Sequence, residues 1–236
     1  MTPLERDLRQ VVIDLPVRVA LGREDFYVTE ANALAVAQID GWRHWPGSKF
    51  ALTGPRGSGK THLANVWQAD SGARIIAAAD LPSADVPALA AGPVCVEDIG
   101  GIAGDRTAEA ALFHLHNLVL SEGHALLMTA PAPPAQLGLA LPDLASRLMG
   151  TQFARLALPD DALLGAILLK LFADRQIRPG PTVVPYLVPR MRRSFSFAQR
   201  LVDEIDRTAL ATHREVTRAL AQACLSRLEQ EVPTDV

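Results

Sequence analysis

Residues 50–61 read Phe50-Ala51-Leu52-Thr53-Gly54-Pro55-Arg56-Gly57-Ser58-Gly59-Lys60-Thr61, an apolar run followed by a glycine-rich turn. The turn fits the pattern G-x-x-x-x-G-K-[S/T], and a helical stretch from Lys60 to Ala69 follows it. Glycines allow positive φ angles, so successive backbone N–H groups can turn inward around a phosphate, and the helix directs its positive dipole end at the same anion. The sequence therefore predicts a polyphosphate site. The alternative is a glycine-rich turn that binds nothing.

The pattern assigns Lys60 to the β- and γ-phosphates and the Thr61 hydroxyl to Mg²⁺. A second metal-holding group is expected at the end of Val94-Cys95-Val96-Glu97-Asp98, which has the form of a Walker B element. We expect Glu97 beside the metal and Asp98 to orient water. Most efficient ATPases have these two roles in the other order, so we expect weak intrinsic hydrolysis. A solvated strand end is the alternative.

Thr129 ends another apolar run, at the place where such NTPases keep a sensor for the γ-phosphate. Threonine also ends many strands that have no such role.

The apolar runs predict an α/β fold with a parallel sheet covered by helices on both faces. Short runs without alternation occur at 50–52, 73–79, 93–96, 125–128 and 153–158, separated by helical stretches at 60–69 and 107–122, with another helix expected over 32–45. After Pro159 the pattern becomes helical, over 162–176, 182–191, 194–212 and 217–230. We expect an extended arm (1–22), a nucleotide-binding α/β domain (23–158) and a small all-helical lid (159–236).

Composition narrows the function classes. The net charge of −3 argues against a general nucleic-acid binder, which needs a surplus of Lys and Arg. Two cysteines, Cys95 and Cys224, are too few for a disulfide framework or a four-ligand zinc site. The polar N-terminus does not have the form of a signal peptide, and no uncharged apolar run is long enough to span a membrane. These features favour a cytoplasmic protein with no membrane partner.

Three segments resemble the DnaA-type AAA+ ATPases, and within them the Hda-type regulators of replication initiation. They are Gly54 to Leu63, Ile102 to Asp105, and Pro133-Pro134 with the following Leu141-Pro142-Asp143-Leu144-Ala145-Ser146-Arg147-Leu148. The resemblance covers about residues 9–230. It implies an AAA+ core with a helical lid, ADP or ATP with Mg²⁺ as cofactor, and a site that includes Pro55, Arg56 and His62.

The same resemblance implies roles for several further residues. Arg147 matches the arginine finger, which reaches a neighbour's ATP; a surface ion pair is the alternative. Arg193, or Arg192 next to it, matches the sensor 2 arginine of the lid, and we prefer Arg193 because Phe195, Ala198 and Val202 then share a buried face. The segment with Tyr27 and Val28 matches the part near the adenine, although it fits a core segment equally well.

The N-terminal arm resembles the peptide with which this family binds the β sliding clamp. The matching residues are Gln10, Val11, Ile13 and Leu15. Gln10 would donate hydrogen bonds while the apolar side chains fill pockets on the clamp. The alternative is an arm that packs on its own domain.

Three departures from the family pattern matter. Val and Ile replace the usual Leu in the arm. The strand ending at Thr129 continues as Ala130-Pro131-Ala132-Pro133-Pro134, without the family's Asp and Arg. The segment between Ala79 and Pro93 is short, so the helices with which the initiator holds single-stranded DNA are not expected, nor is a C-terminal domain for origin DNA.

The sequence leaves three functions open. The first is a clamp-tethered regulator that stimulates ATP hydrolysis by DnaA through Arg147, without a dedicated DNA-binding domain. The second is a self-sufficient AAA+ ATPase, such as a helicase loader or remodelling factor, in which identical copies associate so that Arg147 faces a like subunit. The third is a non-catalytic adaptor that binds DnaA.

Overall fold

A parallel β-sheet forms the centre of the protein. The structure is a computed structural model that describes residues 28, 32–212 and 214–231. Its strands are β1 (Lys49–Thr53), β2 (Arg74–Ala77), β3 (Val94–Glu97), β4 (Leu126–Ala130) and β5 (Phe153–Arg155). They are all parallel and lie in the order β2-β3-β4-β1-β5. The carboxyl ends of β3, β4 and β1 therefore lie side by side at one edge of the sheet.

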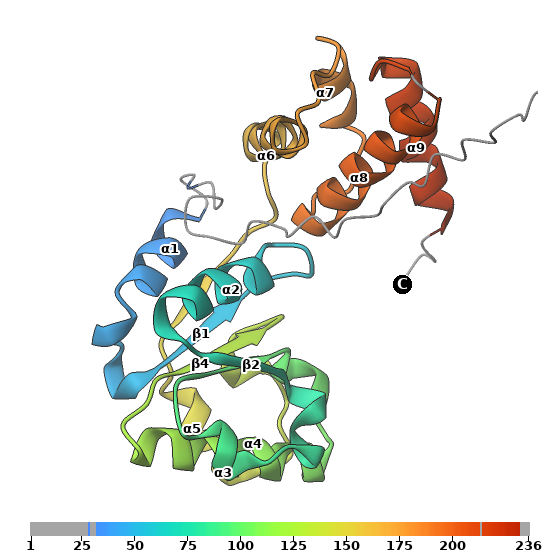
Figure 1. Ribbon diagram of the computed structural model, residues 1–236. Coiled ribbons are helices and arrows are strands. Elements are labelled where there is room, and N and C mark those ends of the chain that lie inside the picture. The colour runs from blue at the N-terminus through green and yellow to red at the C-terminus, as the bar shows by residue number, and fades with distance from the viewer. Residues whose placement is uncertain (1–27, 29–31, 213, 232–236) are drawn as a thin grey trace, which may run out of the picture.

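Helices cover both faces of this sheet (Figure 1). One face carries α1 (Ala33–Asp40) and α2 (Lys60–Ser71), and the other carries α3 (Val86–Leu89), α4 (Arg106–Ser121) and α5 (Pro142–Met149). Short 3₁₀ segments span Trp42–His44, Pro46–Ser48, Ala78–Ser83, Ile99–Ile102 and Pro134–Gln136.

Each face has its own hydrophobic core because successive strand residues point to opposite sides. Phe50 and Leu52 of β1 join the core under α1 and α2, which also contains Trp67. Ala51, between them, joins the core formed with Leu112 and Leu115 of α4. The predicted α/β architecture is confirmed.

Two of the five apolar runs form the edges of the sheet. The run at 73–79 becomes β2, in which Arg74 and Ala77 are exposed, and the run at 153–158 becomes β5, in which only Ala154 is buried. Both edge strands are therefore partly exposed. Among the described residues, each has a neighbouring strand on one side only, so its side chains are less covered than those of β1, β3 and β4.

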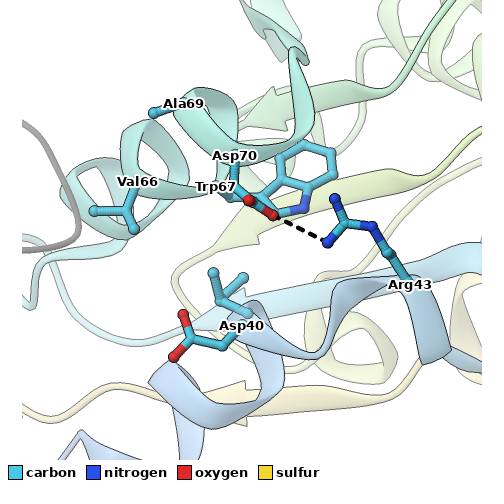
Figure 2. Close-up of a pocket in the computed structure, with 7 residues that line it drawn as sticks. Asp40, Arg43, Val66, Trp67, Ala69 and Asp70 are labelled. Carbon is cyan, nitrogen blue, oxygen red and sulfur yellow. Dashed lines mark hydrogen bonds and ion pairs between the residues drawn. The ribbon is translucent and has the colours of Figure 1, made fainter.

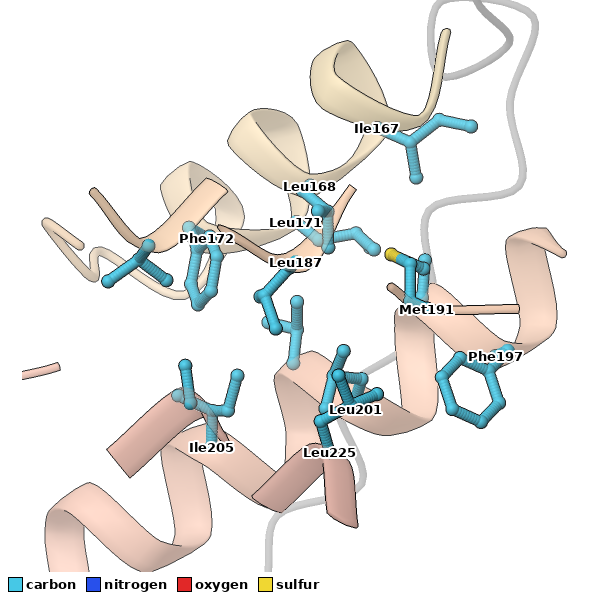
Figure 3. Close-up of a cluster of buried hydrophobic side chains, with 14 of the residues drawn as sticks. Ile167, Leu168, Leu171, Phe172, Leu187, Met191, Phe197, Leu201, Ile205 and Leu225 are labelled. Atoms are coloured by element: carbon cyan, nitrogen blue, oxygen red, sulfur yellow. The ribbon is translucent and has the colours of Figure 1, made fainter. Parts of the chain in front are cut away.

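Beyond β5 the described chain is helical, as predicted. The elements are α6 (Asp161–Asp174), α7 (Val183–Leu187), α8 (Phe195–Thr212) and α9 (Arg218–Glu231). They surround a third core, part of which is drawn in Figure 3, where Leu168 and Phe172 of α6 face Leu201 and Ile205 of α8. We call residues 161–231 the helical region. Within the described residues, no helix is both long enough and apolar enough to cross a membrane.

Candidate nucleotide-binding site

The glycine-rich turn lies between β1 and α2 at the carboxyl edge of the sheet. Its first residue, Gly54, has φ +151°, and a Cβ there would lie 2.2 Å from the carbonyl oxygen of Leu156. Only glycine therefore allows the chain to leave β1 in this direction. The Gly54 N–H donates to the carbonyl of Ala130 (3.1 Å), which fixes the start of the turn to the end of β4.

The helix after the turn begins without a side-chain cap. Gly59 is the N-cap of α2 and has no side chain to satisfy the first amides of the helix. Backbone N–H groups and the positive end of the helix dipole are thus directed at the space in front of residues 54–61, which suits an anion.

Lys60 lies at the first turn of α2, next to this space. Its Nζ donates to the carbonyl oxygens of Gly54 (2.7 Å) and Pro55 (3.0 Å). Partial burial lowers the pKa of Lys60, and the carboxylates of Asp98 and Glu97 raise it, which offsets part of that shift. Lys60 therefore interacts electrostatically with both residues of the predicted Walker B element.

Asp98 and Thr129 are joined by a hydrogen bond between neighbouring strand ends. The Asp98 N–H donates to Oγ1 of Thr129 (3.0 Å), a buried residue of β4. Asp98 has a left-handed backbone (φ 57°, ψ 50°), an uncommon conformation for a residue other than glycine, and its side chain is exposed. The hydroxyl of Thr129 therefore fixes the backbone of Asp98 at the turn after β3.

Glu97 has the properties of a cation ligand. In the described part of the chain, its Oε1 is buried and has no hydrogen-bond partner, and the same is true of Oγ of Ser58 in the turn. A buried carboxylate oxygen without a donor is costly unless a cation or a ligand meets it. The hydroxyl-bearing residue Thr61 is exposed at the start of α2. These residues fit a magnesium ion bound with a polyphosphate.

The helical region meets the turn at the start of α8. A Cβ on Gly57 (φ +85°) would lie 2.9 Å from Cβ of Ser194, and the rings of His62 and Phe195 are 4.5 Å apart between centroids. His62 is buried. Ser194 and Phe195 were not predicted as site residues, although they directly follow the two arginines that the sequence singled out.

Those two arginines lie just before α8 and are both exposed. Arg193 donates through Nη1 to the carbonyl of Pro159 (3.0 Å) and pairs through Nη2 with Asp161. Arg192 instead lies over the ring of Phe197, 5.9 Å from its centroid. Arg193 is thus held beside the segment that connects β5 to α6.

Arg147 lies far from the turn of its own chain. It is exposed on α5, and its carbonyl oxygen accepts a hydrogen bond from Nζ of Lys49 (2.6 Å), the first residue of β1. The turn follows the last residue of β1, and five extended residues span roughly 16 Å. The structure therefore does not bring Arg147 together with Lys60, Glu97 and Asp98.

The remaining predicted residues are peripheral or outside the described chain. Pro55, Arg56 and Val28 are exposed. Tyr27 and the four arm residues Gln10, Val11, Ile13 and Leu15 lie outside the described residues.

Sequence reasoning missed three polar residues around α5: Lys49, Glu109 and His116. Glu109 and His116 are buried on α4, where the apolar pattern suggested hydrophobic contacts only. The scarcity of lysine was a signal for Lys49, since Lys49, Lys60 and Lys170 are the only lysines of the sequence.

A separate pocket of about 430 Å³ lies between α1 and α2 (Figure 2). Trp67 and Val66 form its apolar wall, and Arg43 pairs with Asp70 (3.3 Å) at its rim. Nε1 of Trp42 also donates to Asp70 (2.6 Å). None of the predicted site residues that the structure describes lines this pocket.

No model of a known protein family matches this chain. Solved structures resemble it over most of its length. Domain III of the replication initiation protein DnaA from Thermotoga maritima has a TM-score of 0.74 at 18% identity, covering 90% of this chain and 98% of that one. DnaA from Aquifex aeolicus, in a structure with bound AMPPCP, has a TM-score of 0.67 at 20% identity, covering 88% of this chain and 68% of that one.

The similarity extends beyond the DnaA structures. The AAA domain of FIGL-1 has a TM-score of 0.61 at 16% identity and covers 88% of this chain and 83% of that one. At such identities the comparisons establish the fold. The chain has an AAA+ fold, with a DnaA-like arrangement of the parallel sheet and a helical C-terminal region.

Proposed function

We propose that this chain binds ADP or ATP with Mg²⁺ and acts as a regulator of replication initiation that stimulates ATP hydrolysis by DnaA. Nucleotide binding is supported by the start of α2, where the glycine N-cap has no side chain, by Lys60, and by the buried Oε1 of Glu97, which has no hydrogen-bond partner among the described residues. The DnaA structure with bound AMPPCP, which has the same fold, supports the choice of an adenine nucleotide.

Within this proposal, the backbone around Gly54–Thr61 holds the phosphates and Lys60 exchanges its two carbonyl partners for phosphate oxygens. Thr61 and Glu97 hold the metal. Asp98, whose backbone N–H donates to Thr129, would orient the attacking water. Arg193, or Arg192, contributes from the start of α8. The proposed division is the arm (1–22), the nucleotide-binding domain (23–158) and the lid (159–236).

The position of Arg147 carries the regulatory part of the proposal. An exposed arginine at the opposite end of β1 from the turn cannot serve its own nucleotide, but it is free to enter the site of a partner. There its guanidinium would donate hydrogen bonds to the γ-phosphate oxygens while water attacks the phosphorus and the bond to the β–γ bridging oxygen breaks. The products are ADP and phosphate. Arginine fingers contribute about 10³–10⁵ in rate.

The arm enters the proposal through its sequence alone. Gln10, Val11, Ile13 and Leu15 would tether the chain to the β sliding clamp and so raise its local concentration near DnaA on DNA. An arm peptide that fails to compete with the full chain for purified clamp would remove this part and leave the role of Arg147 intact.

The test measures ATP turnover by purified DnaA in the presence of clamp, DNA and this protein. Arg147→Ala is expected to remove most of the stimulation without changing the affinity of the variant for ADP. Arg178→Ala, an exposed arginine in the helical region, is the matched control. Undiminished stimulation by Arg147→Ala would overturn the finger assignment. No affinity for ADP or ATP with magnesium would overturn the whole proposal.

A self-sufficient ATPase is the second candidate, favoured by the hydrogen bond between Asp98 and Thr129 beside Lys60. In that case identical copies would associate and each Arg147 would serve a neighbour. Turnover by the isolated protein that rises more steeply than its concentration would favour this candidate. A protein that binds DnaA but leaves its turnover unchanged would instead be an adaptor.

A further inference from the structure

The helix that carries Arg147 has little apolar attachment of its own. α5 contains only eight residues, and its buried residues are Leu144 and Leu148. Hydrophobic contact at two positions fixes the side of the helix that faces the core. It constrains less well how the helix slides or tilts along its axis, and these are the movements that would displace an exposed side chain such as Arg147.

Glu109 anchors the N-terminal end of α5. This residue of α4 is fully buried, and its carboxylate accepts three hydrogen bonds from backbone amides. Oε1 accepts from Gly104 (2.8 Å) and Ala140 (2.9 Å), and Oε2 accepts from Leu141 (2.6 Å), the N-cap residue of α5. Burial alone would raise the pKa of Glu109, but the three amides hold it below its usual range, so the carboxylate is ionised at neutral pH.

Lys49 anchors the C-terminal end of the same helix. Its Nζ donates to the carbonyl oxygen of Arg147 (2.6 Å), in the last turn of α5, where a cation also interacts favourably with the helix dipole. Nε2 of His116 lies 3.4 Å from the same Nζ. Burial and the charge of Arg147 lower the pKa of Lys49, so holding the ammonium there has an energetic cost.

We propose that Glu109 and Lys49 are positioning residues that hold α5 at its two ends and thereby set the place of the Arg147 guanidinium. The inference rests on the proposed function, because it matters only if Arg147 acts in a partner's site. The physical reason is that catalytic contacts depend steeply on distance. A displacement of a catalytic group by about 1 Å can lower the rate about 100-fold. The two anchors bond to the main chain, so they fix the helix itself.

The test compares two isosteric variants with two controls. Glu109→Gln keeps the size of the side chain but turns an amide N–H₂ toward the backbone donors. Lys49→Met keeps the length and removes the ammonium. Glu122→Gln, at the exposed end of α4, and Lys170→Met, in α6, change the same charges away from α5.

The main readout is ATP turnover by DnaA, titrated with each variant. Both anchor variants are expected to lower the maximal stimulation about 10- to 100-fold, with the concentration for half-maximal stimulation and their own ADP affinity unchanged. Lys49→Arg, which keeps a cation and a donor, is expected to restore most of the effect. In the background of Arg147→Ala, neither anchor variant should cause a further loss.

A second readout does not depend on the proposed function. Amide hydrogen exchange of residues 139–149 is expected to become about tenfold faster in both anchor variants, while that of α2 stays unchanged. If Arg147→Ala removes stimulation and the anchor variants match wild type in turnover and exchange, the positioning role is overturned. If Arg147→Ala has no effect, the proposed function fails, and faster exchange of α5 would still show that Glu109 and Lys49 hold this helix.

Discussion

The contact between Gly57 and Ser194 makes a sharp prediction about stability. Replacing Gly57 with alanine introduces a Cβ 2.9 Å from Cβ and 3.0 Å from Oγ of Ser194, at a backbone position with φ +85°. The matched variant is Gly59→Ala. Gly59 has a similar φ of +97°, but a Cβ there meets no atom of the described residues within 4 Å. The two variants share the backbone strain and differ in the contact with the helical region.

The expected losses follow from these two terms. A left-handed conformation costs a residue other than glycine about 1–2 kcal/mol, and this applies to both variants. Overpacking adds about 1–3 kcal/mol at Gly57. The nearest atom is Cβ of Ser194, which is bonded directly to the backbone and cannot move aside by a change of rotamer. We therefore expect Gly57→Ala to lower the free energy of unfolding by about 2–5 kcal/mol and Gly59→Ala by about 1–2 kcal/mol.

Urea unfolding without nucleotide measures both losses, and a double-mutant cycle assigns the difference. Ser194→Gly removes the clashing atoms. Oγ of Ser194 accepts a long bond (3.4 Å) from the Phe197 amide and shares a hydrogen bond with the exposed Oγ of Ser196 (2.9 Å). Replacing serine with glycine just before a helix costs about a few tenths of a kcal/mol. Gly57→Ala combined with Ser194→Gly should recover about 1–3 kcal/mol. Equal losses for the two glycine variants, or no recovery in the double variant, would refute the reasoning.

Three further predictions follow from other sites. Glu97→Gln is expected to abolish the gain in ATP affinity that Mg²⁺ provides while leaving metal-free binding intact; an unchanged magnesium dependence in fluorescence titrations would contradict this. Burial lowers the pKa of His116, the hydrogen bond with the Asn117 side chain raises it, and the charges of Lys49 and Arg147 lower it further. The folded state therefore binds a proton at His116 less readily than the unfolded state, in which histidine has an ordinary pKa of about 6.5. The free energy of unfolding should therefore fall as the pH drops below about 6.5. His116→Gln should flatten this slope in urea unfolding at pH 5.5–7.5, whereas an equal slope would exclude the role. Phe172→Ala removes a fully buried ring from the core of the helical region and should cost about 3–5 kcal/mol in the same assay; a loss below about 1 kcal/mol would show that this core is not tightly packed.

The sequence predicted the centre of the fold well because its signals there are local. The runs that became β1, β3 and β4 are uniformly apolar, and such runs indicate strands buried on both faces. At residues 54–61, the spacing of Gly54, Gly59 and Lys60 is enough to predict the phosphate-binding turn. The contact between Asp98 and Thr129 then depends on the order of the strands, which the sequence alone did not supply.

The parts that were missed depend on contacts between distant segments. α5 was not predicted as a helix, because it is short and buries only Leu144 and Leu148. Glu109 lies on a helix whose periodicity indicates an apolar face. Two of the three amides that stabilise its buried charge lie 31 and 32 residues further along the chain. The periodicity of a helix indicates which of its faces is buried, but it does not indicate which loop will pack beside that helix.

The helical region has a hydrophobic interior separate from those on the two faces of the sheet, and it meets the turn through Ser194 and Phe195. A nucleotide bound between the turn and α8 would therefore contact both the sheet-containing part of the chain and the helical region. Its binding should alter the distance between fluorophores attached to α2 and α9 while the circular dichroism of the protein stays the same. The surface that the protein presents to a partner would then depend on which nucleotide is bound.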